Sequence, residues 1–274
     1  MADLAEYGMV GLDDPLASYL PAWVEVPTFG GRQITLGDLA SHAGGLRRDP
    51  KGMLRRWLRD RRNPYAALSV DSLYAGLART KLRRRPGERV KYSNLGAGLL
   101  GDALARAAGQ SYEELVRERI CLPLGLRDTV VTPTGEQTAR LATAYTRRAR
   151  PAPPLEIPAL VGAGALRSTA TDLLCFLRAN LDPAQTSLAS QLERTQLPRL
   201  RMARRAEVGL GWLIAHPPGL AGPTLWHNGG TSGFRSFVGV ARQTGSAVVV
   251  LSNTARSVDR LGLRLLKTLA GDAG

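Results

Sequence analysis

Apolar residues recur with a helical period through the middle of the chain, whereas short apolar runs typical of strands gather near its C-terminus. The helical pattern predicts helices over residues 4–10, 35–40, 71–80, 95–108, 112–120, 172–180 and 257–270. Strands are predicted over residues 208–215, 234–241 and 246–252. The last two strands are separated by a short segment that ends in Gly245, which predicts a β-hairpin.

Polar residues that can accept hydrogen bonds from backbone N–H groups stand where several of these helices should begin. Thr35, followed by Asp38 three residues later, resembles a capping box. The other candidate N-caps are Asp71, Ser111 and either Thr169 or Thr171.

The order of these elements, with no internal repeat, predicts an α/β (α+β) protein with two lobes and a cleft between them. We expect a mainly helical lobe over residues 31–165. We expect the strands in a discontinuous α/β lobe that comprises residues 1–30 and 166–274.

The net charge of +14 first suggests a nucleic-acid partner. Only four of the 37 basic residues are lysines, however, and the excess of arginine along the chain indicates a bias towards arginine codons. Aromatic residues make up 5% of the chain, and none interleave with the basic runs as a base-stacking platform needs. We therefore expect no nucleic-acid partner.

No apolar run approaches the roughly 20 residues of a membrane-spanning helix, so we expect no membrane span. Asp3 and Glu6 stand where a secretory signal would have basic residues and then an apolar core. The printed sequence therefore predicts a cytoplasmic location, although relatives of the family named below are often exported.

Cysteines and histidines give no metal-binding pattern. Cys121 and Cys175 lie far apart among apolar residues, which predicts two buried free thiols. The three histidines, His42, His216 and His227, do not stand at metal-ligand spacing from one another or from a cysteine. We expect no metal and no cofactor.

The first candidate site is Tyr92, Ser93 and Asn94, directly after a Pro-Gly turn and before a predicted helix. A tyrosine near a cation can have its pKa lowered and then act as a general base. The asparagine amide can hold a substrate carbonyl. The structural alternative is that Tyr92 packs and that Ser93 or Asn94 caps the helix.

The second candidate site is the glycine-rich segment of residues 226–234, W-H-N-G-G-T-S-G-F. Glycines let a ligand approach the backbone closely, and a backbone N–H there can stabilise an oxyanion. His227 would add a positive or hydrogen-bonding group. The structural alternative is a glycine-rich hairpin that carries a histidine by chance.

Residues 96–101 match the dinucleotide-binding pattern G-x-G-x-x-G. They follow a Tyr-Ser-Asn loop rather than a strand, and they lie inside a predicted helix. We therefore interpret these glycines as a place of close helix packing, not as a nucleotide site.

Taken together, these motifs and others in the same order resemble the serine β-lactamase and penicillin-binding-protein superfamily. The closest branch comprises class C β-lactamases, D-alanyl-D-alanine carboxypeptidases and family VIII esterases. The matching segments are residues 12–21, 34–46, 86–96, 122–129, 163–172, 209–212 and 227–229. The resemblance implies a β-lactamase/transpeptidase-like fold, with an antiparallel sheet flanked by helices and a mostly helical lobe.

The resemblance also implies roles for particular residues. Tyr92 matches the proposed proton acceptor, Asn94 its amide partner, and Gly230 half of an oxyanion hole. The catalytic set it implies is Tyr92, Asn94, His227, Gly229 and Gly230. The substrate-binding set it implies is Asn94, Asn228, Gly230 and Thr231. The expected partner is a small-molecule or peptide substrate, and the histidine that opens the matching segment of residues 227–229 favours esterase or peptidase members. The oligomeric state stays open.

The family's nucleophile lies in an S-x-x-K motif, in which the lysine helps to deprotonate the serine. The residues three positions before the four lysines are Arg48, Ala78, Glu88 and Arg264, so this chain has no such motif. We expect the serine, its lysine and the first strands to lie upstream of Met1. The chain is then a fragment of a serine hydrolase that is inactive as printed; the alternative is a pseudo-enzyme that binds peptidoglycan-like or ester ligands.

Overall fold

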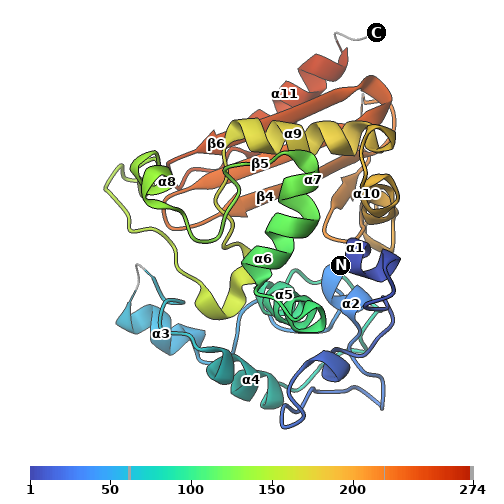
Figure 1. Ribbon diagram of the computed structural model, residues 1–274, viewed down its shortest axis with the longest axis vertical. Helices are drawn as coiled ribbons and strands as arrows, with labels where there is room; N and C mark the ends of the chain where they lie inside the picture. The colour runs from blue at the N-terminus through green and yellow to red at the C-terminus, as the bar shows by residue number, and fades with distance from the viewer. Residues whose placement is uncertain (61–62, 219, 272–274) are drawn as a thin grey trace. The chain divides into compact units, whose positions relative to one another are not determined.

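A computed structural model describes residues 1–60, 63–218 and 220–271, and these form two compact units (Figure 1). Unit 1 comprises Met1–Leu115, Leu155–Ala165 and Arg199–Met202. Unit 2 comprises Val116–Pro154, Leu166–Pro198 and Ala203–Gly274. These bounds differ from those of the predicted lobes. Residues 272–274 of the predicted α/β lobe lie outside the described part of the chain. Residues 1–30 belong to the helical unit, and residues 116–154 belong to the unit that holds the sheet.

Unit 1 is built from short helices around one long one. Its helices are α1 (Ala2–Glu6), η1 (Leu16–Tyr19), α2 (Leu36–Ala40), α3 (Met53–Arg59), α4 (Val70–Ala78), α5 (Asn94–Ala108) and η3 (Pro158–Ala163). Leu4 and Leu16 are buried in the same apolar core as Leu39 and Leu99. This shared core explains why the N-terminal residues group with the helices and not with the sheet.

Side-chain caps mark the starts of three of these seven helices, α2, α4 and α5. Thr35 and Asp38 form the predicted capping box at the start of α2, with both reciprocal hydrogen bonds present. At α4 the predicted cap is wrong, because Ser69 accepts the hydrogen bond from the Ser72 N–H and Asp71 lies in the first turn. Asp71 there still favours the helix through its charge.

The glycines of α5 permit close packing against η3, as predicted. A β-carbon on Gly98 would lie 2.3 Å from Leu160 Cδ2. A β-carbon on Gly101 would lie 2.9 Å from the Cα atom of Gly162. Distances this short leave no room for a side chain, so the residues that match G-x-G-x-x-G serve helix packing.

An antiparallel sheet lies almost wholly in unit 2, since only residues 200–202 of its first strand are grouped with unit 1. Among the described residues six strands form one sheet in chain order: β1 (Leu200–Ala203), β2 (Ala206–Val208), β3 (Leu213–Ala215), β4 (Thr224–Gly230), β5 (Arg235–Ala241) and β6 (Ser246–Ser252). The predicted β5–β6 hairpin is confirmed, and Gly245 closes its turn with φ +63°.

The single strand predicted over residues 208–215 is wrong. A turn separates β2 from β3, and the Gly209 N–H donates to the Trp212 carbonyl at 2.9 Å. Gly211 has φ +96°, and a β-carbon on Gly209 would lie 2.4 Å from the Thr195 carbonyl oxygen. These two glycines let the chain reverse where an apolar run suggested continuity.

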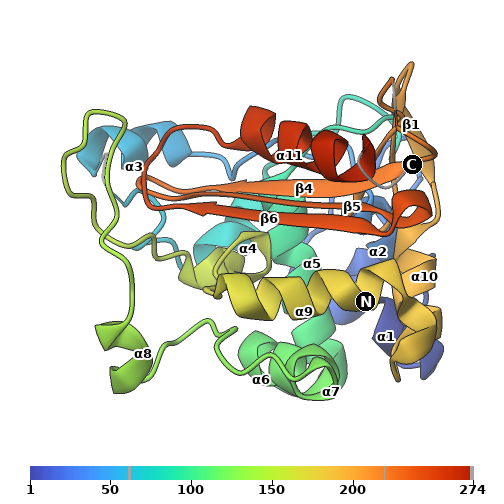
Figure 2. The same cartoon turned by 90° about the horizontal axis from the view of Figure 1, so that it is seen from above.

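Helices cover both faces of the sheet in unit 2, with α9 (Ala170–Leu181) on one face and α11 (Asp259–Gly271) on the other (Figure 2). Leu225 and Val240 point to the α9 face, where they pack with Leu177. Val248 points to the α11 face, where it packs with Leu266. The remaining helical segments are η2 (Arg117–Cys121), α7 (Leu122–Leu124), α8 (Gly135–Ala139), η4 (Pro183–Gln185), α10 (Ala189–Gln196) and η5 (Arg242–Thr244), with α6 (Tyr112–Val116) at the boundary of the units.

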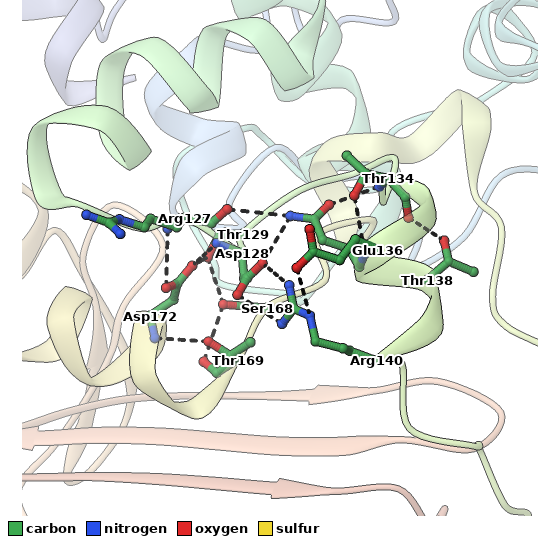
Figure 3. Close-up of polar contacts among 11 residues, drawn as sticks. Arg127, Asp128, Thr129, Thr134, Glu136, Thr138, Arg140, Ser168, Thr169 and Asp172 are labelled. Carbon is green, nitrogen blue, oxygen red and sulfur yellow. Dashed lines mark hydrogen bonds and ion pairs between the residues drawn. The ribbon is translucent and has the colours of Figure 1, made fainter.

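Two of the segments that carry the family resemblance bind each other within unit 2. Asp172, in the first turn of α9, accepts hydrogen bonds from the Asp128 N–H and the Thr129 hydroxyl, both at 2.8 Å (Figure 3). Thr169 caps α9 by accepting from the Asp172 N–H. Arg140 of α8's C-terminal end holds the carboxylate of Asp128 through both terminal nitrogens. These motifs therefore fasten the segment after α7 to the start of α9.

Cys121 is buried as predicted, but Cys175 is exposed on α9, so one of the two thiols is not in a core. Both cysteines are free thiols. In the described part of the chain, no helix is both long and apolar enough to cross a membrane.

Candidate active site

Tyr92 lies two residues before the start of α5, in contact with an imidazole ring and a guanidinium group. Its ring centroid is 4.4 Å from that of His42, and Arg48 Cζ lies 5.6 Å from the same centroid. Burial raises the pKa of Tyr92, the charge of Arg48 lowers it and that of Asp49 raises it, with a net rise. A cation therefore does lie beside Tyr92, but the net pKa change is opposite to the one that the sequence suggested.

Asn94 is held by a carboxylate that the sequence analysis did not single out. Its side-chain Nδ2 donates to Asp49 Oδ1 at 2.9 Å, and the same oxygen accepts from the Tyr65 hydroxyl at 2.9 Å. Burial and Asp49 together raise the pKa of Tyr65 to about 12. Asp49 therefore fixes the orientation of the Asn94 amide at the first turn of α5.

Ser93 serves the structure of the loop. Its hydroxyl accepts from the Gly96 N–H as the N-cap of α5 and donates to the Arg47 carbonyl at 2.6 Å. Its backbone N–H donates to His42 Nδ1 at 3.4 Å. The structural alternative is thus confirmed for Ser93, whereas Tyr92 keeps 37% of its surface exposed.

His42 is a functional candidate that sequence reasoning missed. It is buried and has φ +54°, a backbone conformation that is uncommon outside glycine. Its carbonyl accepts from the Lys91 N–H at 2.8 Å, which fixes the residue directly before Tyr92. The Ser-His-Ala-Gly-Gly sequence around His42 belongs to a matching segment, and that was its only signal.

In unit 2, His227 lies on β4 and faces the same side of the sheet as Val238, its partner on β5. Its Nδ1 donates to the Asn228 carbonyl oxygen at 2.8 Å, because a carbonyl can only accept. Burial lowers the pKa of His227, and the backbone hydrogen bond partly opposes that change. At neutral pH the ring is therefore neutral, with its proton on Nδ1 and a lone pair on Nε2.

The side chains of β4 alternate between the two faces of the sheet. Gly229 lies on the face of His227, opposite Ser236, and a β-carbon there would lie 2.4 Å from Ser236 Oγ. Asn228 lies on the other face, where its Nδ2 donates to Asp259 Oδ2 of α11 at 3.0 Å. The Asn228 side chain is thus engaged with α11 on the face away from His227.

Gly230 and Thr231 lie at the end of β4, where the chain turns into β5. Gly230 pairs with Arg235. The Thr231 N–H donates to the Phe234 carbonyl at 3.0 Å, and its hydroxyl accepts from the Phe234 N–H at 3.1 Å. These bonds hold the turn and leave Gly230 exposed, with the Arg235 side chain lying beside it.

One edge of β4 is only partly paired. β3 pairs with Thr224, Leu225 and Trp226, whereas β5 pairs with β4 as far as Gly230. From His227 to Gly230 the strand therefore extends beyond β3, and a strand edge of this kind can bind an extended ligand through its backbone groups.

The predicted site residues fall into two sets. Tyr92 and Asn94 lie in unit 1, around Arg48 and Asp49. His227, Asn228, Gly229, Gly230 and Thr231 lie in unit 2, at the end of β4. Across residues 1–60, 63–218 and 220–271, no group of three or more His, Cys, Asp or Glu side chains is placed to hold a metal ion.

Comparison with known proteins gives matches along nearly the whole chain. The family model named Beta-lactamase matches residues 1–272. The D-alanyl-D-alanine-carboxypeptidase/endopeptidase AmpH of Escherichia coli K12 is 34% identical over 264 residues, which cover 91% of this chain and 66% of that protein. The chain thus spans about two thirds of the length of this curated relative.

Solved structures also match this chain along nearly its whole length. A β-lactamase/D-alanine carboxypeptidase from Yersinia pestis is 30% identical with a TM-score of 0.78, and the match covers 100% of this chain and 77% of that one. The D-alanine carboxypeptidase AmpC from Burkholderia cenocepacia, at 24% identity and a TM-score of 0.78, shows likeness of fold alone over 99% of this chain and 79% of that one. The predicted fold class, an antiparallel sheet flanked by helices together with a helical part, is confirmed.

Proposed function

Because the chain belongs to the β-lactamase family, we propose that it forms the substrate-binding and proton-transfer part of a serine hydrolase. The reaction would transfer an acyl group from an ester, an amide or a β-lactam to a serine and then to water. D-alanyl peptides are the first substrates to test, since AmpH is named as a D-alanyl-D-alanine carboxypeptidase and endopeptidase.

The observation that carries the proposal is the end of β4. His227 has a neutral ring there, with its proton on Nδ1, and Gly229 and Gly230 leave the backbone exposed beyond β3. An extended acyl substrate would bind along this edge. The Gly230 N–H would donate to the oxyanion that develops on the substrate carbonyl, and His227 would hydrogen-bond the substrate beside it.

Tyr92 would take part in proton transfer. With its pKa raised by burial, its phenol is protonated at neutral pH and serves as a proton donor. It becomes a base only if a second cation joins Arg48 beside it. We propose that the lysine of an S-x-x-K segment supplies this cation, and that Tyr92 acts as a base only in its presence.

The residues of this sequence do not supply the nucleophile, because no lysine stands three positions after a serine. We propose that an S-x-x-K segment outside these residues provides it. The second candidate function is a pseudo-enzyme that binds peptidoglycan-like or ester ligands. The absent motif favours that candidate, and the intact Tyr92, Asn94, His227 and Gly229 favour the hydrolase.

The test compares the printed chain with the chain extended through the in-frame codons that precede Met1 in its gene. Both are assayed with nitrocefin, p-nitrophenyl acetate and a D-alanyl-D-alanine peptide, and with a fluorescent penicillin that marks an acyl-enzyme. We expect no turnover by the printed chain and hydrolysis of at least one substrate by the extended chain. Tyr92→Phe should lower that activity by about 10²–10⁴-fold, whereas Tyr7→Phe, at an exposed helix end, should not.

Stoichiometric labelling of the printed chain by the fluorescent penicillin would overturn the assignment of the nucleophile. A stop codon upstream without any S-x-x-K, together with ligand binding but no turnover, would replace the hydrolase by the pseudo-enzyme.

A further inference from the structure

Unit 1 contains a pocket of about 910 Å³ whose charged side chains are all basic. Two segments form it, one around Gly45 and the other running from Thr80 to Lys91. The arginines that line it are Arg47, Arg83, Arg84, Arg85 and Arg89. The lysines that line it are Lys51, Lys81 and Lys91. No aspartate or glutamate lines the pocket, so every charged side chain of its wall is positive.

The distribution of lysines sets this pocket apart from the general excess of arginine. The chain holds only four lysines, and three of them line this one pocket. A bias towards arginine codons explains why basic positions elsewhere are arginines. It does not explain why lysines and arginines gather here without a single acid.

The cations of the pocket are not neutralised by neighbouring groups. In the described part of the chain, the side chains of Arg83, Arg84, Arg85 and Arg89 make no ion pair and no hydrogen bond. Lys51 Nζ donates to a neutral acceptor, the Arg79 carbonyl, at 2.7 Å. Like charges gathered in this way repel one another, and a bound anion would relieve the repulsion.

The backbone that carries these cations is anchored. The Gly87 N–H donates to the Ala43 carbonyl at 2.9 Å, and the Lys91 N–H donates to the His42 carbonyl at 2.8 Å. Leu82, between two pocket cations, is buried in the core of unit 1. The backbone is therefore held in place before any ligand arrives, and only the side chains of the cations remain to be ordered by binding.

The composition of the lining indicates the chemistry of the ligand. No aromatic side chain lines the pocket, and all of its charged groups are cations. Guanidinium forks and ammonium groups suit tetrahedral phosphate oxygens, which accept several charge-assisted hydrogen bonds. We propose that this pocket binds clustered phosphate groups, in a soluble oligophosphate or in the headgroups of an anionic lipid surface. Tyr92, Asn94 and the residues at the end of β4 do not line this pocket, although Lys91 directly precedes Tyr92.

The test uses the full chain and a matched pair of triple variants. Arg83→Ala, Arg84→Ala and Arg85→Ala remove three charges from the pocket. Arg260→Ala, Arg264→Ala and Lys267→Ala remove three charges from the exposed side of α11, so the net charge is the same in both variants. Binding of inorganic tripolyphosphate is measured by calorimetry, and binding of phosphatidylglycerol vesicles by co-sedimentation, with phosphatidylcholine vesicles as the neutral control.

We expect the pocket triple variant to bind at least one of the two phosphate probes about tenfold more weakly, and the α11 variant to stay within about twofold of the parent. Binding should weaken at high salt, because screening reaches these exposed groups. Loss of tripolyphosphate binding identifies a soluble ligand, and loss of vesicle binding alone identifies a lipid surface. Each of these results supports the proposal.

Equal loss in both triple variants would overturn the proposal, since net charge alone would then explain the binding. Absence of binding to both probes by the parent chain would also overturn it. If the pocket triple variant does not fold, phosphate binding by the single variant Lys81→Ala is measured instead. We expect Lys81→Ala to bind about threefold more weakly and Lys267→Ala to bind as the parent does.

Discussion

The Asn94 amide donates a hydrogen bond to Asp49 Oδ1 at 2.9 Å, although the two residues stand 45 positions apart in the chain. The Tyr65 hydroxyl donates to the same oxygen. One partly buried carboxylate thus orients a predicted catalytic amide and binds a phenol, and that phenol can report on the carboxylate.

Replacing Asp49 with alanine should lower the pKa of Tyr65 from about 12 towards 10. The carboxylate disfavours a tyrosinate through both its hydrogen bond and its charge. Burial is the larger cause of the raised pKa, so the pKa should remain above 10. Ultraviolet titration of tyrosinate, with the difference taken against Tyr65→Phe, measures the change. The exposed substitution Asp71→Ala should leave the titration unaltered, and an unchanged curve for Asp49→Ala would contradict the assigned hydrogen bond.

His227 should make the folded state less stable in mild acid. Its pKa is lowered from 6.5 in the folded state, so unfolding allows the ring to take up a proton as the pH falls. The stability that it contributes is present above pH 6.5 and is lost as the pH falls through the folded-state pKa. Imidazole NMR titration gives that pKa, and urea denaturation along the same pH series gives the stability.

His227→Gln should flatten the loss of stability below pH 6.5. The matched substitution His216→Gln, at an exposed imidazole paired with Glu207, should leave that loss in place. A His227 signal that titrates above 6.5 would contradict the neutral ring on which the proposed substrate contact depends.

Asp172→Ala should lower the free energy of unfolding by about 2–4 kcal/mol, because it removes a buried carboxylate and leaves backbone N–H groups without their acceptor. Those donors are Arg127 and Asp128, and the Thr129 hydroxyl loses the same partner (Figure 3). The control is Glu136→Gln, whose carboxylate is exposed and lies 4.0 Å from Arg140. Chemical denaturation should show almost no change in stability for Glu136→Gln. Equal losses of stability in the two variants would show that Asp172 does not hold the segment after α7 to the start of α9.

Gly101→Ala should destabilise the protein by about 1–3 kcal/mol, since its methyl group would lie against the backbone of Gly162 at 2.9 Å. Gly135→Ala offers the opposite case in α8, where a β-carbon meets nothing within 4 Å. That variant should gain about 0.5–1 kcal/mol from the loss of glycine's backbone freedom. Thermal melting of both variants measures these changes in stability. A Gly101→Ala variant as stable as the parent would exclude close packing of α5 against η3.

Much of the local structure could be predicted because its signals lie within a few residues of one another. The capping box of Thr35 and Asp38 and the hairpin after β5 are confirmed. Ser111 is likewise the predicted N-cap, since its Oγ accepts from the Glu114 N–H at 3.2 Å. Motif order along the chain was enough to identify the family and its fold.

Other features could not be predicted, because packing between distant segments decides them. The strand over residues 208–215 breaks where Gly209 meets a carbonyl from α10. Asn228, predicted to bind substrate, has its amide directed to α11 by strand alternation, and Tyr92 has its pKa raised by burial despite Arg48.

The sequence by itself determined the family and the fold class, and it placed the candidate residues Tyr92, Asn94 and His227 in short motifs. Only the tertiary structure decided the orientation, hydrogen-bond partners and proton affinity of those side chains. The Asp49 carboxylate under Asn94 comes from far along the chain, and so do the basic residues that gather in one pocket of unit 1. Proton affinity and hydrogen-bond direction depend on burial and on such distant neighbours, and only the folded chain supplies both.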